Sequence, residues 1–330
     1  MYIINKAAID FILKKLNDFT PVTNHNFSQC DYFLPGNFRL ENICINFDRE
    51  KISNSVYFNE YTGATSSIGS ASLKAINSLS GMDIRSCFHT AELMRADPSF
   101  NSKSSWNDQF RLIFFDRWQA SEQQRLESIS RLLDLSKCDR IDANCFCDDL
   151  SRMIRQNYTT TRSPMFLYGI YGKISEPQNF GIKIYFATKH LRSSFDNSSS
   201  HTVTSWRNGE SLIKEFCAES GIESTSLLKI NSEIIKFCPQ NRMSFWGLNL
   251  SPARNKEIKI YYLLPNTPQQ NYFPLLSGLI PHDHINNLKN ILNFFKEQCF
   301  CLRYIAVSGD SKNSVIKTYF FPTIHSAVAR

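Results

Sequence analysis

Three segments of the chain carry a lysine followed two positions later by a tyrosine, within runs rich in isoleucine and phenylalanine. Such runs are typical of β-strands. Side chains two positions apart on a strand point to the same face, so each pair would present a cation beside a phenol. The pairs are Lys183 with Tyr185, Lys259 with Tyr261, and Lys317 with Tyr319.

A fourth segment, residues 109–115, carries Arg111 in place of the lysine, while Ile113 stands where the tyrosine would be. One such pair means little, because a lysine on a strand is most often solvated. Three pairs and an arginine variant indicate an internal repeat with a chemical purpose. We expect the isoleucine and phenylalanine faces to pack outward and the lysine and tyrosine faces to share one interior.

Several cations on one interior face repel one another, and lysines removed from water are costly unless an anion joins them. A diphosphate, with its concentrated negative charge, fits this need best. Arginine pairs bidentately with phosphate and lysine supplies a point charge. Tyrosine hydroxyls could donate hydrogen bonds to phosphate oxygens, and tyrosine rings could flank a developing carbocation.

Hairpins and helices alternate along the chain, about five times over. Antiparallel hairpins separated by helices exclude a parallel, doubly wound sheet. If each hairpin pairs with the next, ten strands close into an antiparallel β-barrel without open edges, surrounded by α-helices. This α+β fold needs one domain, residues 1–330, since no linker separates the repeats. Expected hairpins cover 43–60, 165–186, 243–264 and 302–321, the Arg111 strand adds to them, and residues 65–95 are expected to be helical in two pieces.

The composition suits a globular protein with a real core, at 42% hydrophobic and 20% charged residues. The net charge of +7 is moderate and its residues form no runs, so we expect no nucleic-acid partner. No run has a signal peptide's layout or approaches the length of a membrane span, so we expect no membrane partner.

Ten cysteines are present, and two pairs are separated by a single residue, Cys145 with Cys147 and Cys299 with Cys301. Zinc sites usually space their cysteines more widely and add histidines. Burial as small hydrophobic side chains is therefore the favoured interpretation. Free thiols indicate the reducing cytoplasm, and we expect a monomer.

With these repeats the sequence resembles the aromatic prenyltransferases of the ABBA fold, from about residue 42 to residue 322. In that family the second strand of successive hairpins supplies the cations that bind the prenyl diphosphate and the tyrosines that shield the allyl cation. The resemblance implies diphosphate-binding roles for Arg111, Lys183, Lys259 and Lys317, and shielding roles for Tyr185, Tyr261 and Tyr319.

The resemblance also implies a mechanism. The cations hold the diphosphate and stabilise its growing charge, the carbon–oxygen bond ionises, and an aromatic acceptor attacks the cation. The family lacks the aspartate-rich DDxxD motif, which is absent here too, so no cofactor is required, although magnesium assists some members. Glu60, at the end of the first hairpin, is a candidate catalytic base, and an exposed strand-end carboxylate is an equal interpretation. Tyr168 and Trp246 are candidates for stacking the acceptor ring, with core packing as the alternative.

The leading hypothesis is an enzyme of secondary metabolism that transfers a dimethylallyl or geranyl group from its diphosphate to a small aromatic acceptor. We expect an indole-type acceptor, with a phenolic one close behind. Two alternatives stay open: a cyclic-peptide prenyltransferase of the cyanobactin type, and a non-catalytic barrel that binds a hydrophobic anion. The serine-rich stretch 192–205 would exclude a peptide if it folded over the barrel mouth.

Overall fold

The structure, a computed structural model, describes most of the strands and helices of the chain. The serine-rich stretch 192–205 lies outside the described residues, so its expected role stays a prediction. The described residues are 6–19, 38–60, 84–89, 92–97, 100–101, 109–115, 120–136, 142–157, 165–173, 176, 179–187, 214–215, 217–218, 222–237, 243–251, 254–265, 267–309 and 314–323.

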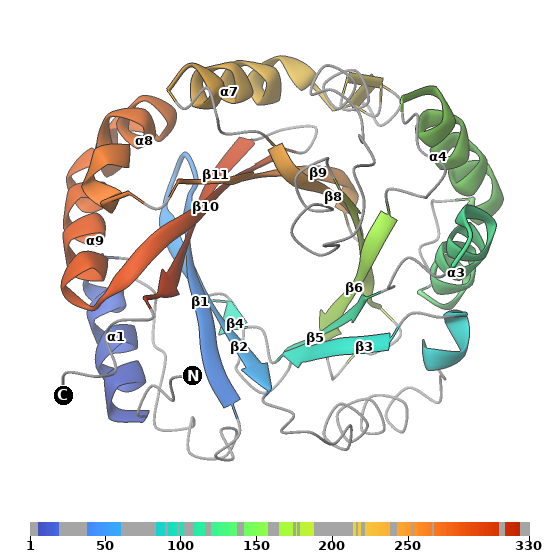
Figure 1. Cartoon of the computed structure of the whole chain (residues 1–330), viewed down its shortest axis with the longest axis horizontal. Helices are drawn as coiled ribbons and strands as arrows, with labels where there is room; N and C mark the ends of the chain where they lie inside the picture. The colour runs from blue at the N-terminus through green and yellow to red at the C-terminus, as the bar shows by residue number, and fades with distance from the viewer. Residues whose placement is uncertain are drawn as a thin grey trace, which may run out of the picture.

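Eleven strands form one sheet in the order β3-β5-β6-β7-β8-β9-β10-β11-β1-β2-β4, and every neighbouring pair is antiparallel. Figure 1 shows this sheet curled into a ring of strands, with the helices outside it. The strands are β1 (Phe38–Phe47), β2 (Ile52–Glu60), β3 (Glu92–Asp97), β4 (Phe100–Asn101), β5 (Gln109–Phe115), β6 (Met165–Lys173), β7 (Gly181–Ala187), β8 (Met243–Ser251), β9 (Arg254–Leu263), β10 (Phe300–Gly309) and β11 (Ser314–Pro322).

The four expected hairpins are confirmed as β1–β2, β6–β7, β8–β9 and β10–β11. Each hairpin pairs with the next, so β5, β7, β9, β11 and β2 all run in the same direction, one antiparallel strand apart. The first and last hairpins meet where Ile43 of β1 faces Phe320 of β11.

Residues 65–83 of the segment expected to be helical lie outside the described residues, so the helix expected there stays a prediction, whereas residues 92–95 belong to a strand. β3 pairs with β5, and two residues later β4 pairs with β2, so consecutive pieces of chain lie at opposite ends of the sheet order. A 3₁₀ turn, η2 (Ile84–Cys87), precedes β3. The abundant serine and alanine suggested helix, but tertiary pairing along an edge outweighs such weak local preferences.

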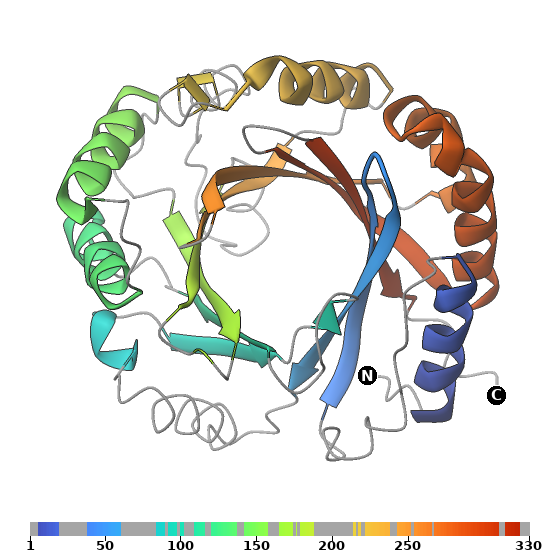
Figure 2. The same cartoon turned by 180° about the vertical axis from the view of Figure 1, so that it is seen from behind.

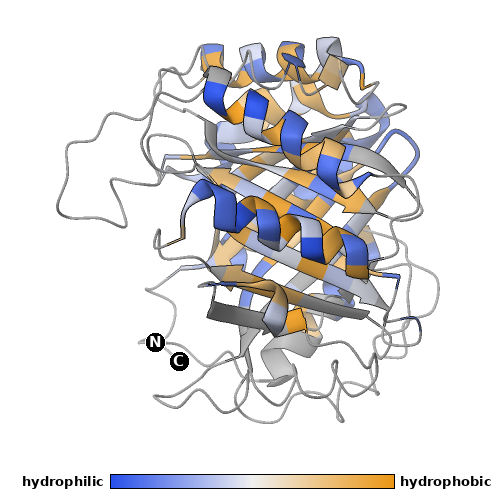
Figure 3. Cartoon of the chain, turned by 90° about the vertical axis from the view of Figure 1, so that its right-hand side faces the viewer, coloured by the Kyte–Doolittle hydropathy of each residue, from blue (hydrophilic) through white to orange (hydrophobic). Residues whose placement is uncertain are grey.

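The helices lie on the outside of the curled sheet, as both face-on views show (Figures 1 and 2). Their amphipathic sequences appear as alternating hydrophilic and hydrophobic bands in Figure 3. Among the described residues no helix is long and apolar enough to cross a membrane. The helices are α1 (Lys6–Phe19), α3 (Glu122–Leu135), α4 (Ala143–Asn157), α7 (Ser224–Phe237), α8 (Phe273–Leu279) and α9 (Ile285–Glu297), with 3₁₀ turns η3 (Gln269–Tyr272) and η4 (His282–His284).

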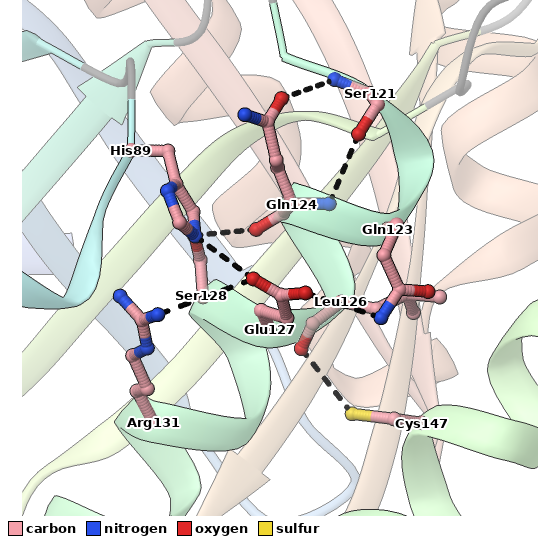
Figure 4. Close-up of polar contacts among 9 residues, drawn as sticks. All are labelled: His89, Ser121, Gln123, Gln124, Leu126, Glu127, Ser128, Arg131 and Cys147. Atoms are coloured by element: carbon pink, nitrogen blue, oxygen red, sulfur yellow. Dashed lines mark hydrogen bonds and ion pairs between the residues drawn. The ribbon is translucent and has the colours of Figure 1, made fainter.

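Helix α3 begins with a capping box, shown in Figure 4. The Ser121 side chain accepts a hydrogen bond from the Gln124 amide at 3.2 Å, and the Gln124 side chain accepts one from the Ser121 amide at 2.9 Å. Both groups would otherwise lack helical partners. One turn further along α3, Glu127 Oε2 lies 3.0 Å from His89 Nε2. This contact joins the segment that follows η2 to the helix.

The main hydrophobic core fills the layer between the sheet's outer face and the helices. Ile258, Ile260 and Tyr262 of β9 are fully buried there, as the alternation of that strand predicts. The Tyr262 hydroxyl also donates a hydrogen bond to Asn231 of α7. The outer face is therefore packed against helices, and the inner face is left for other chemistry.

Candidate functional site

The tyrosines of the three pairs belong to a small cluster separate from the main core, and each lysine lies two positions earlier on the same inner face of its strand. Because β7, β9 and β11 run in parallel, each strand presents its lysine first and its tyrosine two residues later. The register then repeats from hairpin to hairpin. A tyrosine on one strand faces a small residue on the next, and that small residue faces the following lysine: Tyr185–Gly247–Lys259 and Tyr261–Ala306–Lys317.

Lys183 reaches across the neighbouring strand to the tyrosine beyond it. Its Nζ donates a hydrogen bond to the Tyr261 hydroxyl at 2.7 Å and lies 4.9 Å from the Tyr185 ring centroid and 5.2 Å from that of Tyr261. These distances are those of cation–π contacts. Lys183 is half-buried, so its ammonium group is held by phenols while solvent still reaches the side chain.

Lys259 repeats this arrangement one hairpin further. Its Nζ donates a hydrogen bond to the Tyr319 hydroxyl and lies 4.8 Å and 5.0 Å from the ring centroids of Tyr261 and Tyr319. The residue is only 5% exposed. Burial, followed by the charges of Lys317 and Lys183, holds the pKa of Lys259 well below its usual value.

The structure gives fewer contacts for the two remaining predicted cations, Lys317 and Arg111. Lys317 is half-buried on β11 and its charge acts on both Lys259 and Glu257. Arg111 lies in β5, paired with Asp97 and Tyr171, but its side chain is outside the described part of the structure. The structure thus brings Lys183, Lys259 and Lys317 together, and the role of Arg111 stays a prediction.

The tyrosines form a continuous arc of rings. Centroids of Tyr185 and Tyr261 are 6.3 Å apart, those of Tyr261 and Tyr319 are 6.0 Å apart, and Tyr57 follows at 6.4 Å from Tyr319. Burial raises the pKa of Tyr319 well above its usual value, so its hydroxyl keeps its proton. The arc offers ring faces and hydroxyl groups to whatever occupies the inner face.

Tyr57 was missed by the sequence reasoning, although a signal was present. On β2, Ser55 and Tyr57 occupy the positions of the lysine and the tyrosine, and Cys44 faces both Ser55 and Tyr319. Serine replaces the cation, which hid the repeat. Aligning the second strands without demanding a charge would have found it.

Glu257 is a second residue that the sequence reasoning missed, although it stands two positions before Lys259 and therefore shares its face. Asn249 of β8 donates a hydrogen bond from Nδ2 to Glu257 Oε2 at 2.5 Å. Burial alone would raise the pKa of Glu257, but the charge of Lys317, this hydrogen bond and the charges of Lys183 and Lys259 together lower it. The carboxylate is therefore ionised and partly balances the lysines.

Glycines make room for the lysine side chains. A Cβ atom at Gly247 would lie 2.9 Å from Lys183 Cε and 3.5 Å from Tyr185 Cδ1, and one at Gly169 would lie 3.3 Å from Lys183 Cβ. Lys183 therefore crosses β8 directly over Gly247 on its way to Tyr261. The register between strands decides this, so the sequence alone did not reveal it.

Tyr168 and Trp246 do not lie with the lysines. Both belong to the outer hydrophobic core, where Trp246 stacks on Phe186 at 4.0 Å between centroids and Tyr168 contacts Phe88 at 5.5 Å. Their expected stacking against an acceptor on the inner face is therefore wrong, because strand alternation turns them toward the helices. Glu60 ends β2 opposite Phe38, and its side chain is outside the described residues.

Comparison with solved structures identifies the fold. The chain is similar to AnaPT from Neosartorya fischeri (TM-score 0.52, 13% identity, covering 86% of this chain and 78% of that one). It is also similar to the NotF prenyltransferase (TM-score 0.55, 10% identity, 86% and 80%). A third similar structure is 6-dimethylallyltryptophan synthase from Micromonospora olivasterospora in complex with DMASPP and Trp (TM-score 0.52, 9% identity, 87% and 82%).

At sequence identities this low, the similarity shows a shared fold only. The expected resemblance to the ABBA fold is therefore confirmed as a resemblance of fold. No protein-family model matches the sequence. No curated protein matches it either. What the inner face does must therefore be argued from its own residues.

Proposed function

We propose that the protein is an aromatic prenyltransferase whose inner face binds a prenyl diphosphate. The observation that carries the proposal is the interleaved set of three lysines and four tyrosines on one face, within a fold shared with solved prenyltransferases. Lysines gathered this closely need an anion to neutralise them, and the half-buried state of Lys183 and Lys317 gives a ligand access.

We further propose that the curled sheet is a closed barrel formed by one domain, residues 1–330. Support comes from the two residues that separate β3, paired with β5, from β4, paired with β2. A link of that length spans at most about 11 Å, so it holds the two ends of the sheet order near each other. Taken as one interrupted strand, β3 and β4 bring the number of strands to the expected ten.

In the proposed reaction the lysine ammonium groups hold the diphosphate and stabilise the charge that grows on it as the carbon–oxygen bond breaks. Preorganised donors of this kind each contribute about 10²–10³-fold to a rate. The leaving diphosphate takes both electrons of the bond, and an allylic cation remains. Arg111 is proposed as a fourth donor from β5.

The tyrosine arc is proposed to protect this cation from water. Ring faces attract a cation by roughly 0.5–2 kcal/mol each. Lys183 and Lys259 lie over the rings of Tyr185, Tyr261 and Tyr319. The rings therefore have the geometry to stabilise positive charge, and an anion that draws the ammonium groups away would free their faces.

We propose an indole-type acceptor, or a phenolic one, that attacks the cation and then loses a ring proton to a base. NotF is named as a prenyltransferase, and the Micromonospora olivasterospora enzyme as a 6-dimethylallyltryptophan synthase in complex with DMASPP and Trp, which supports this choice. Glu60 stays the predicted base, with the released diphosphate as the alternative. Tyr168 and Trp246 are no longer assigned to acceptor binding.

We infer that the reaction requires no cofactor. Lys183, Lys259 and Lys317 can supply the positive charge for the leaving diphosphate without a metal ion. Magnesium assistance stays a prediction, tested by turnover with and without a chelator. The expected cytoplasmic location is supported by the free thiols of the seven described cysteines. The monomeric state and the absence of nucleic-acid or membrane partners also stay predictions.

The test is incubation with dimethylallyl or geranyl diphosphate and tryptophan, a simple indole, a phenol or a cyclic peptide. Alkylated indole or phenol with release of diphosphate supports the proposal, and alkylation of the peptide alone would favour the cyanobactin-type alternative. Binding or hydrolysis without alkylation of any acceptor would refute it. Lys183→Ala should lower turnover strongly, whereas Lys289→Ala on the outer helix α9 is a matched control that should not.

A further inference from the structure

Lys259 differs from its neighbours in how completely it is enclosed. It is 5% exposed, whereas Lys183 and Lys317 are half-buried. Its hydrogen bond goes to a neutral phenol, Tyr319, and two tyrosine rings cover it. Within the described part of the chain no carboxylate forms an ion pair with it.

The charged and titratable groups that face Lys259 come from every surrounding strand. Lys183 on β7 and Lys317 on β11 repel its charge, and Glu257 on β9 and the Cys44 thiol of β1 act in the opposite direction. Burial is the largest influence and outweighs the two favourable ones. The facing residues without charge are Tyr261 on its own strand, Tyr319 on β11, Ser308 on β10 and Gly247 on β8.

A lysine so enclosed gains little from carrying a charge in the empty protein. Water does not solvate it, both neighbouring ammonium groups repel it, and Glu257 is shared among three lysines. The pKa of its ammonium group is held far below 10.5 for these reasons. A bound diphosphate would reverse this balance, because several negative charges would then lie against the same side chains.

We propose that Lys259 is neutral while the inner face is empty and takes up one proton from solvent when a diphosphate anion binds. The proton adds to the lone pair of Nζ, and the resulting ammonium group becomes a third cation against the phosphate oxygens. This inference adds a protonation step to the proposed binding of the prenyl diphosphate, and it rests on that proposed function. It makes diphosphate binding a proton-coupled step, with Lys259 charged only when its charge is needed.

The sign of the pH dependence follows from linkage. Below the pKa of Lys259 in the empty protein the lysine is already protonated, and binding takes up no proton through it. Between that pKa and the higher value in the complex, binding takes up about one proton, and affinity falls by up to about tenfold for each pH unit of increase. Above the pKa in the complex the lysine stays neutral and the uptake ends.

The experiment is isothermal titration calorimetry with dimethylallyl S-thiolodiphosphate, repeated at one pH in buffers of different ionisation enthalpy. The slope of binding enthalpy against buffer enthalpy gives the number of protons taken up. Lys259→Arg keeps a permanent charge and Lys259→Met removes the titrating group. Lys317→Arg, at the matching position of β11, is the control. Proton changes of the ligand itself are common to all four proteins, so differences between them report on Lys259.

We expect wild type and Lys317→Arg to take up about one proton more than either Lys259 variant. Binding with equal proton uptake in all four proteins would overturn this inference, while the proposed binding of a prenyl diphosphate would still hold. If the Lys259 variants do not fold, wild type alone decides: binding without proton uptake at every pH between about 6 and 9 contradicts the proposal. Failure of wild type to bind the analogue at any pH would instead refute the proposed function.

Discussion

Replacing Gly247 with alanine tests whether the path of Lys183 across β8 matters. The new Cβ would lie 2.9 Å from Lys183 Cε, and an ordinary contact begins at 3.4 Å. The lysine must therefore move by roughly 0.5 Å, which is easier than moving backbone because the side chain is flexible. That displacement pulls Nζ from its 2.7 Å hydrogen bond with Tyr261.

We expect Gly247→Ala to weaken binding of the prenyl diphosphate more than it lowers the stability of the fold. A misplacement of about 1 Å can lower a rate by about 100-fold, so a shift of half that size should weaken binding or turnover by about tenfold. Overpacking at a flexible neighbour should lower the free energy of unfolding by only about 1 kcal/mol. Donor binding is measured by calorimetry with the thiolodiphosphate analogue, and stability by denaturant unfolding.

Gly278→Ala on α8 is the matched control. A Cβ there meets nothing within 4 Å, and alanine favours helix over glycine by up to about 1 kcal/mol. This variant should bind the analogue as wild type does and unfold at equal or higher denaturant concentration. A tenfold loss of binding in Gly278→Ala would show that glycine replacement affects binding by a general route.

The double variant Gly247→Ala with Lys183→Ala decides the mechanism. If alanine at 247 acts by moving Lys183, it should cost almost nothing more once the lysine is gone. Additive losses of binding from the two substitutions would refute the reasoning, because the effect of Gly247 would then not pass through Lys183.

Three further outcomes follow from the inner face and the thiols. Tyr261→Phe keeps the ring face and loses the hydroxyl, so it should reduce turnover less than Lys183→Ala does, as steady-state assays will measure. Glu257→Gln should lower the melting temperature at neutral pH. Because the pKa of Glu257 in the folded protein is lowered below its usual 4.5, the difference in melting temperature from wild type should persist down to about pH 4.5 and disappear as the pH falls further. The exposed Cys299 should react with iodoacetamide in the folded protein, whereas Cys217, whose pKa burial raises to about 11, should react only on unfolding, as mass spectrometry will show.

The lysine and tyrosine rows were predictable because they depend on spacing within one strand. Alternation along β9 places Lys259 and Tyr261 together whatever the neighbouring strands do, and the hairpins follow from runs bounded by turn residues. The same rule should have placed Trp246, which alternates with Leu248 and Leu250 on the buried outer face. That apolar alternation was the available signal, and attention to aromatic character alone missed it.

Features that depend on the register between strands could not be read from the sequence. Gly247 and Ala306 are ordinary small residues until pairing places each between a tyrosine and a lysine. β3 was assigned to helix because its pairing with β5 is a long-range property and its composition is ambiguous. The pKa of Lys259 likewise depends on groups from four strands at once, β1, β7, β9 and β11.

The contact between β1 and β11 sets when the molecule can mature during synthesis. Cys44 meets Tyr319 across a separation of almost the whole chain, so the pairing of β1 with β11 must wait for the C-terminal hairpin to leave the ribosome. Until then both β1 and β9 present bare hydrogen-bonding edges, which invite pairing with other chains. Expression in soluble form should therefore depend on chaperones that shield those edges during translation, long before any ligand is met.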